Sequence, residues 1–71
     1  MLSDADLTLL DFEATAPRSV GAKEDAIRSD LGLSPIRYYQ RLNVLLDSSE
    51  ALAMRPQLVR RLQRLRDRSA G

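Results

Sequence analysis

Apolar residues recur along this chain at helical spacing, in four segments separated by proline, glycine and serine. The first segment covers residues 3–15. Ser3 is a good N-cap with Asp6 three residues later, and Pro17 ends the run. Its apolar positions are Leu7, Leu9, Leu10, Phe12 and Ala14. The pattern predicts a helix that packs one side against a core.

The second and third segments form a pattern of helix, glycine turn and helix. Residues 20–31 predict a helix, and Gly32 follows it where a left-handed backbone suits glycine. The apolar positions that we expect this helix to bury are Val20, Ile27 and Leu31. Ser34 as N-cap and Pro35 as first helical residue then start a helix over residues 35–46. This outline is typical of the helix-turn-helix motif of DNA-binding proteins.

The last segment predicts a helix over residues 56–68, after a short extra turn at residues 50–54. Arg55 marks the boundary, because a residue that precedes a proline is disfavoured in the helical region. The residues expected on its buried side are Leu58, Leu62 and Leu65. No segment alternates strictly between apolar and polar residues, as a half-buried strand would. We therefore predict one all-α domain over residues 1–71, a compact bundle of about four helices that contains the helix-turn-helix.

The predicted helix over residues 35–46 has two different sides. Its core side consists of Tyr38, Leu42, Leu45 and Leu46. The residues on the outward side, which we expect to contact DNA bases, are Ile36, Arg37, Tyr39, Gln40 and Asn43. Amide side chains bind adenine edges, arginine binds guanine, and apolar side chains touch the thymine methyl group. An ordinary polar surface is the alternative interpretation of the same residues.

Charge is distributed unevenly along the chain, although the net charge is only +1. Residues 1–34 hold seven acids and three bases, whereas residues 55–71 hold six arginines and one acid. Such asymmetry is expected when one face of a protein meets an anion. A solvated helix whose charges suit its own dipole would show the same gradient.

The predicted phosphate contacts come from two helices. Ser34 and Arg41 belong to the third segment, where free N–H groups at a helix start attract anions, although simple capping by Ser34 is an alternative. Four arginines of the last segment share a sector about 100° wide: Arg60, Arg61, Arg64 and Arg68. They could follow a phosphate backbone, with the salt dependence that such contacts bring, or dock on an acidic protein surface.

The composition argues against catalysis and metal binding. The chain has no cysteine and no histidine, so thiolate nucleophiles, cysteine-based zinc sites and the commonest general base are missing. We expect no enzymatic activity, no metal and no cofactor. No apolar run approaches the roughly 18 residues of a membrane span, so we expect a cytoplasmic protein without membrane contact.

Three short motifs resemble those of a family of small actinobacterial proteins, a domain of unknown function with helix-turn-helix character. They are Gly-Ala-Lys-Glu at residues 21–24, Arg-Tyr-Tyr-Gln at residues 37–40 and Leu-Val-Arg-Arg-Leu at residues 58–62. The resemblance covers residues 10–66 and implies the same helical fold, without an established biochemical role. One departure from the wider helix-turn-helix class is Arg28, where a small residue is usual. We expect Arg28 to turn outward or to pair with Glu13 or Asp47.

Two functional hypotheses follow. The first is a DNA-binding protein, a transcriptional regulator or nucleoid-associated factor, with residues 35–46 in the major groove and the last helix on phosphates. Its partner would be double-stranded DNA, and it would act as a homodimer or with a protein partner, because one small protomer binds DNA weakly. The alternative is a non-enzymatic protein-interaction module that docks on transcription machinery or another acidic partner.

Overall fold

The computed structural model describes residues 2–70, and the side chains of residues 2–68. Five helices follow one another in this range, and no strand is present in it: α1 (Asp4–Thr15), α2 (Val20–Leu31), α3 (Pro35–Leu46), α4 (Ser49–Met54) and α5 (Pro56–Ala70). The predicted all-α fold is confirmed. The extra turn expected before Pro56 is the short helix α4, and α5 continues two residues beyond the predicted end.

Serine caps determine where four of the five helices begin. Ser3, Ser19, Ser34 and Ser48 each accept a hydrogen bond from the backbone N–H three residues later. At α1 the cap is reciprocal, since the Asp6 carboxylate also accepts the Ser3 N–H at 3.1 Å. These bonds satisfy N–H groups that have no partner within the helix, so the local sequence alone locates the helix starts.

The turn between α2 and α3 depends on Gly32. Its backbone is left-handed, with φ 66° and ψ 22°. Its N–H donates to the Arg28 carbonyl at 3.1 Å, and the Leu33 N–H donates to the Ile27 carbonyl at 3.4 Å. The bond from the Gly32 N–H to the carbonyl four residues earlier is that of the αL motif, which ends a helix on a glycine. The predicted turn glycine is confirmed.

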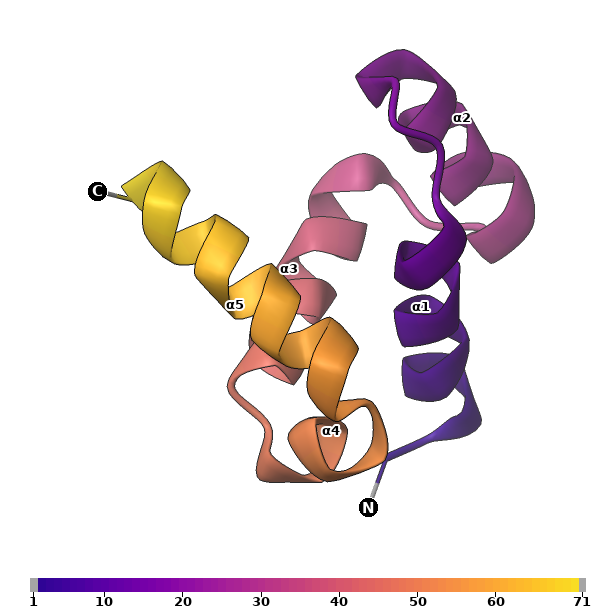
Figure 1. Cartoon of the computed structure of the whole chain (residues 1–71). Coiled ribbons are helices and arrows are strands. Elements are labelled where there is room, and N and C mark those ends of the chain that lie inside the picture. The colour runs from indigo at the N-terminus through magenta and orange to yellow at the C-terminus, as the bar shows by residue number, and fades with distance from the viewer. Residues whose placement is uncertain (1, 71) are drawn as a thin grey trace.

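The helix α3 lies at the centre of the bundle, and the other four helices pack against it (Figure 1). The core consists of ten buried side chains: Leu9, Leu10, Ile27, Tyr38, Leu42, Leu45, Leu46, Ala51, Val59 and Leu62. The four residues predicted for the core side of α3 are all among them. The other helices cover the side of α3 that carries these four residues. The opposite side of α3 is therefore the one that reaches solvent.

Three residues predicted to lie on the buried sides of their helices are exposed, and the first of them is Ala14 of α1. Val20 exposes 69% of its surface and Leu65 exposes 50%. Both lie where α5 diverges from the junction of α1 and α2, so no neighbouring helix covers them. On α5 the fully buried residue is Val59, while Leu58 is only partly buried. The predicted stripe was therefore rotated by about one residue, because helical spacing alone does not tell which of two adjacent apolar positions faces a neighbour.

Candidate nucleic-acid interface

The outward side of α3 is open to solvent. All five residues predicted to contact bases are exposed, and Ile36 exposes 73% of its surface. Val44, which the sequence analysis did not include, lies on the same side and exposes 72%. Ile36, Gln40 and Val44 are four residues apart and therefore form one line along the helix. The sequence signal for Val44 is its spacing. It follows Ile36 by eight residues and Gln40 by four, so helical periodicity places all three on the same side.

Arginine and amide side chains flank this line. Arg37 and Arg41 lie on one side of it and Asn43 on the other, as the helical periodicity requires. Gln40, Arg41 and Val44 border a shallow hollow of about 260 Å³, with Asp6 of α1 at its edge. We call the six residues Ile36, Arg37, Gln40, Arg41, Asn43 and Val44 the α3 surface. It combines hydrogen-bonding groups, cations and aliphatic groups on one rigid helix.

Ser34 and Arg28 take local partners. The Ser34 hydroxyl accepts the Arg37 N–H at 3.2 Å, so its oxygen caps α3. Arg28 donates to Asp25 at 3.3 Å within α2, and both side chains are exposed. Arg28 therefore turns outward, which is the first of the two expected outcomes, and its partner in the described part of the chain is Asp25 rather than Glu13 or Asp47.

Tyr39 has a different environment from the rest of the predicted base contacts. Its ring lies at 5.1 Å from the Tyr38 ring, edge to face, and the Lys23 Nζ lies 5.3 Å from its centre. It lines a cleft between α5 and the α1–α2 junction, together with Arg61 and Leu65. Tyr39 is thus at the border of the α3 surface and belongs mainly to the cleft.

A partly buried polar cluster next to Tyr39 joins α1, α2 and α3. The Tyr38 hydroxyl donates to the Glu13 carboxylate, and the Lys23 Nζ donates to the same carboxylate at 2.9 Å. The Phe12 ring packs edge to face on Tyr38, 5.7 Å between centres. Burial raises the pKa of the Tyr38 hydroxyl above its ordinary range, and the bond to Glu13 raises it further. Sequence spacing did not reveal this cluster, which holds the three helices at fixed positions.

Replacing Tyr38 with phenylalanine tests the cluster. Tyr38→Phe removes only the hydroxyl, and we expect a loss of about 1–3 kcal/mol in the free energy of unfolding at neutral pH. Because the folded state raises the pKa of Tyr38, its contribution is complete below the unfolded value near pH 10 and decreases above it. The difference between the two proteins should shrink by about 1.4 kcal/mol per pH unit beyond that value. Urea unfolding from pH 7 to 11 measures it.

The control for this experiment is Tyr39→Phe. The Tyr39 ring is partly exposed, and no hydrogen bond of its hydroxyl is present in the described part of the chain. We expect a change of at most about 0.5 kcal/mol, without the pH dependence. Equal effects of the two substitutions would contradict the role given to the Tyr38 hydroxyl.

The six arginines of the C-terminal segment divide into two groups. Arg55 binds Asp11 of α1 at 2.9 Å, which raises the pKa of Arg55, and Arg66 binds Asp47 at 3.0 Å. These two ion pairs attach α5 and its start to the bundle. The four arginines predicted to contact phosphates, Arg60, Arg61, Arg64 and Arg68, are all exposed. Within residues 2–68 none of the four forms an ion pair.

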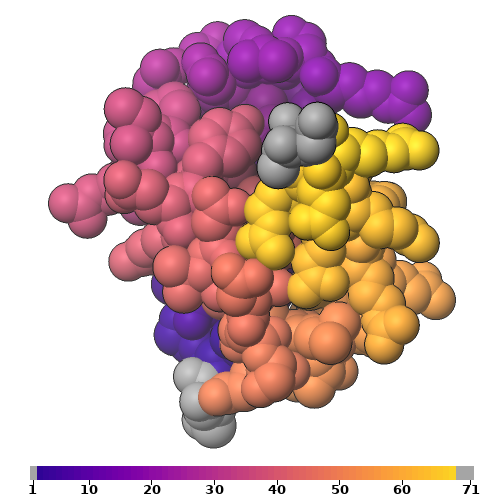
Figure 2. Space-filling view, turned by 90° about the vertical axis from the view of Figure 1, so that its left-hand side faces the viewer, coloured from indigo at the N-terminus to yellow at the C-terminus, as the bar shows by residue number. Residues whose placement is uncertain are grey.

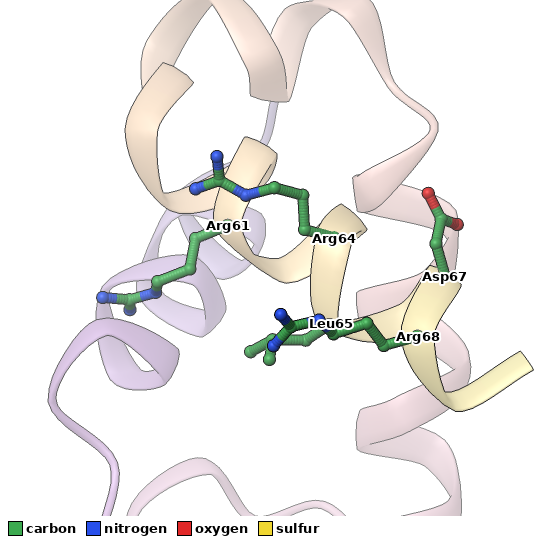
Figure 3. Close-up of a pocket in the computed structure, with 5 residues that line it drawn as sticks. All are labelled: Arg61, Arg64, Leu65, Asp67 and Arg68. Carbon is green, nitrogen blue, oxygen red and sulfur yellow. The ribbon is translucent and has the colours of Figure 1, made fainter. Parts of the chain in front are cut away.

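These four arginines and the α3 surface face different directions. The side of α5 that meets α3 is defined by Gln63, which donates to the Leu46 carbonyl at 2.6 Å, and by Arg66. The four arginines lie roughly 150° around α5 from that side. Figure 2 shows side chains of α3 projecting at one edge of the molecule and side chains of α5 projecting at the other. Arg61, Arg64 and Arg68 extend from the same side of α5 with their guanidinium groups spread apart, whereas Asp67 points away from them (Figure 3).

The described residues contain no cluster of three or more metal-binding side chains. Likewise, none of the helices found in residues 4–70 combines the length and apolar character needed to cross a membrane.

Comparison with protein families places the chain in a family whose function is not known. The model of the family described as protein of unknown function (DUF3263) matches residues 1–70, and the chain belongs to that family. No curated protein and no solved structure matches the chain. The domain-of-unknown-function resemblance is confirmed by the family match.

Proposed function

We propose that this protein is a non-enzymatic DNA-binding module of the helix-turn-helix type, in which α3 enters the major groove. The observation that carries the proposal is the open α3 surface. Although α3 packs against four helices, its arginine and amide side chains are free of the bundle. A regulator or a nucleoid-associated factor would both use such a helix. The actinobacterial origin implied by the sequence motifs stays a prediction.

The chemistry of the α3 surface supports contact with base edges. Gln40 and Asn43 are suited to adenine, and Arg37 to guanine, while Ile36 and Val44 are suited to thymine methyl groups. The glycine turn and the Ser34 cap hold the helix rigidly, so few degrees of freedom are lost on binding. Arg41, at the flank of the same surface, is our proposed phosphate contact, together with the Ile36 N–H at the start of α3.

Salt dependence of DNA binding tests the proposal and separates the two groups of arginines. We expect fluorescence anisotropy with a random duplex to give a negative slope of log affinity against log salt. The double substitution Arg37→Ala, Arg41→Ala should reduce its magnitude by about 1, since Arg41 is the proposed phosphate contact of the pair and each lost phosphate contact contributes about 0.9. An absence of binding at low salt would overturn the proposal.

The matched control is Arg60→Ala, Arg64→Ala, which removes the same charge from α5. Because these arginines face away from α3, we expect a much smaller change in the slope. If this pair reduced the slope and the α3 pair did not, α5 would be the DNA-binding helix and the role proposed for α3 would be wrong. The phosphate contacts predicted for the α5 arginines stay a prediction that this comparison decides.

A further inference from the structure

A cleft of about 620 Å³ opens between α5 and the junction of α1 with α2. Val20 of α2 and Leu65 of α5 form its walls, and Tyr39 of α3 lies between them. All three are large hydrophobic residues with substantial exposed surface. Contiguous exposed apolar surface of this kind marks an interaction site more often than scattered single residues do.

The rim of the cleft is basic. Arg18 and Arg61 border it, and in the described part of the chain neither forms an ion pair. Lys23 also lines it, but its charge is matched by Glu13. Arg64 and Arg68 continue the positive surface along α5, around a neighbouring hollow that shares Arg61 and Leu65 with the cleft (Figure 3). We call this region the basic cleft.

A second apolar hollow, of about 480 Å³, lies between the start of α1 and α4. Leu2 and Leu7 line it together with the exposed Met54, and Asp4 supplies a negative charge at its edge. We call it the acidic patch. Figure 1 places α4 and the start of α1 at the lower end of the molecule, whereas α2, which borders the basic cleft, lies at the upper end.

The two regions are complementary. Each combines apolar side chains with charge of one sign, and the signs are opposite. We propose that the acidic patch of one copy docks on the basic cleft of a second copy, head to tail. The proposal accounts for four of the six exposed large hydrophobics, and the other two, Ile36 and Val44, belong to the α3 surface. It holds whether or not α3 binds DNA.

This contact joins two different surfaces, so it is heterologous and leaves a free patch and a free cleft at the ends of a pair. Such contacts continue into rings or open chains. A standard interface buries about 800 Å² per partner, roughly one sixth of the 4993 Å² surface of this chain. A contact limited to the two regions is at most of that size, so we expect weak, concentration-dependent association.

A second copy fits the basic cleft better than a nucleic acid does. A phosphate backbone would use the arginines but would leave Val20 and Leu65 in contact with water. The acidic patch satisfies both features at once, since its leucines and Met54 supply apolar surface beside the Asp4 carboxylate. The salt-sensitive charges would set the orientation, and burial of apolar surface would supply most of the affinity.

Sedimentation of the whole chain at low salt, without DNA, tests the proposal. We expect the average mass to rise above 8.0 kDa with concentration, measured up to about 1 mM so that a millimolar Kd is still detected. Arg61→Glu in the cleft and Asp4→Arg in the patch should each reduce association at least tenfold. Mixed in equal amounts, the two variants should associate again, because each supplies the surface that the other has lost.

The matched control is Arg28→Glu, which makes the same charge change on an exposed face of α2 outside both regions. It should associate like the parent. Circular dichroism confirms folding of each variant, and Leu65→Glu is a second cleft variant at an exposed position. A monomer up to the highest concentration, unchanged association in Arg61→Glu, or a mixture that stays monomeric would each overturn the proposal. A closed dimer insensitive to both charge reversals would do so as well.

Discussion

Replacing Glu13 with alanine should reduce the free energy of unfolding by about 3 kcal/mol. The substitution leaves the buried Tyr38 hydroxyl without its acceptor and removes the counter-ion of Lys23. The Glu13 side chain is only 9% exposed and that of Lys23 only 17%, so solvent cannot replace the lost partner. For a chain of this length the total is roughly 4–10 kcal/mol, and the loss is a large part of it. Thermal unfolding should show a decrease in Tm of about 12–24 °C.

The control is Asp25→Ala, which removes another carboxylate that pairs with a cation. Asp25 and Arg28 are both mainly exposed, so their ion pair should contribute about 0.5 kcal/mol or less. Glu13→Gln keeps an acceptor for the Tyr38 hydroxyl and should lie between the two. If Glu13→Ala melted within a few degrees of Asp25→Ala, the cluster would not be what holds α1, α2 and α3 together.

Replacing Gly32 with valine should cost about 2–3 kcal/mol. The backbone at Gly32 is left-handed, which a β-branched residue adopts only with strain. A Cβ at this position would meet nothing within 4 Å, so the whole effect comes from the backbone and none from a clash. Urea unfolding measures the loss. The slope with denaturant should stay unchanged if only the folded turn is strained.

The loss of stability should depend on which residue replaces Gly32. Gly32→Asn should be the mildest change, because asparagine tolerates left-handed backbone, and Gly32→Ala should cost about 1 kcal/mol. A valine variant as stable as the parent would mean that α2 and α3 do not depend on this turn. The placement of the α3 surface depends on the same turn, so Gly32→Val should also weaken any DNA binding more than Gly32→Asn does.

The proposed head-to-tail contact would reinforce DNA binding by the α3 surface. One protomer offers few phosphate contacts, and nonspecific affinities of about 10⁻⁴ to 10⁻⁶ M are typical of such binding at physiological salt. Copies joined through the acidic patch and the basic cleft would bind one duplex as a multivalent unit, which raises the overall affinity without a new contact to DNA. The arginines of α5 would then serve assembly, which agrees with their direction away from α3.

Local sequence signals determined the helices of this protein. Serine caps, Pro35 and Gly32 act within a few residues of themselves, so their effects could be predicted from the chain alone. The exposed polar side of α3 was predictable for the same reason, since Tyr38 and Leu42 define the opposite, buried side. These features depend on helical periodicity and on bonds between near neighbours.

Only the tertiary structure decided which distant residues come into contact and which apolar and charged side chains stay exposed. The bond between Glu13 and Tyr38 joins residues far apart in sequence, and no spacing rule connects them. The exposure of Val20 and Leu65 depends on where α5 diverges from α2, and the direction of the four free arginines depends on which side of α5 meets α3. Periodicity fixes the angle between residues on one helix, whereas the rotation of that helix against its neighbours is set by packing of the whole core.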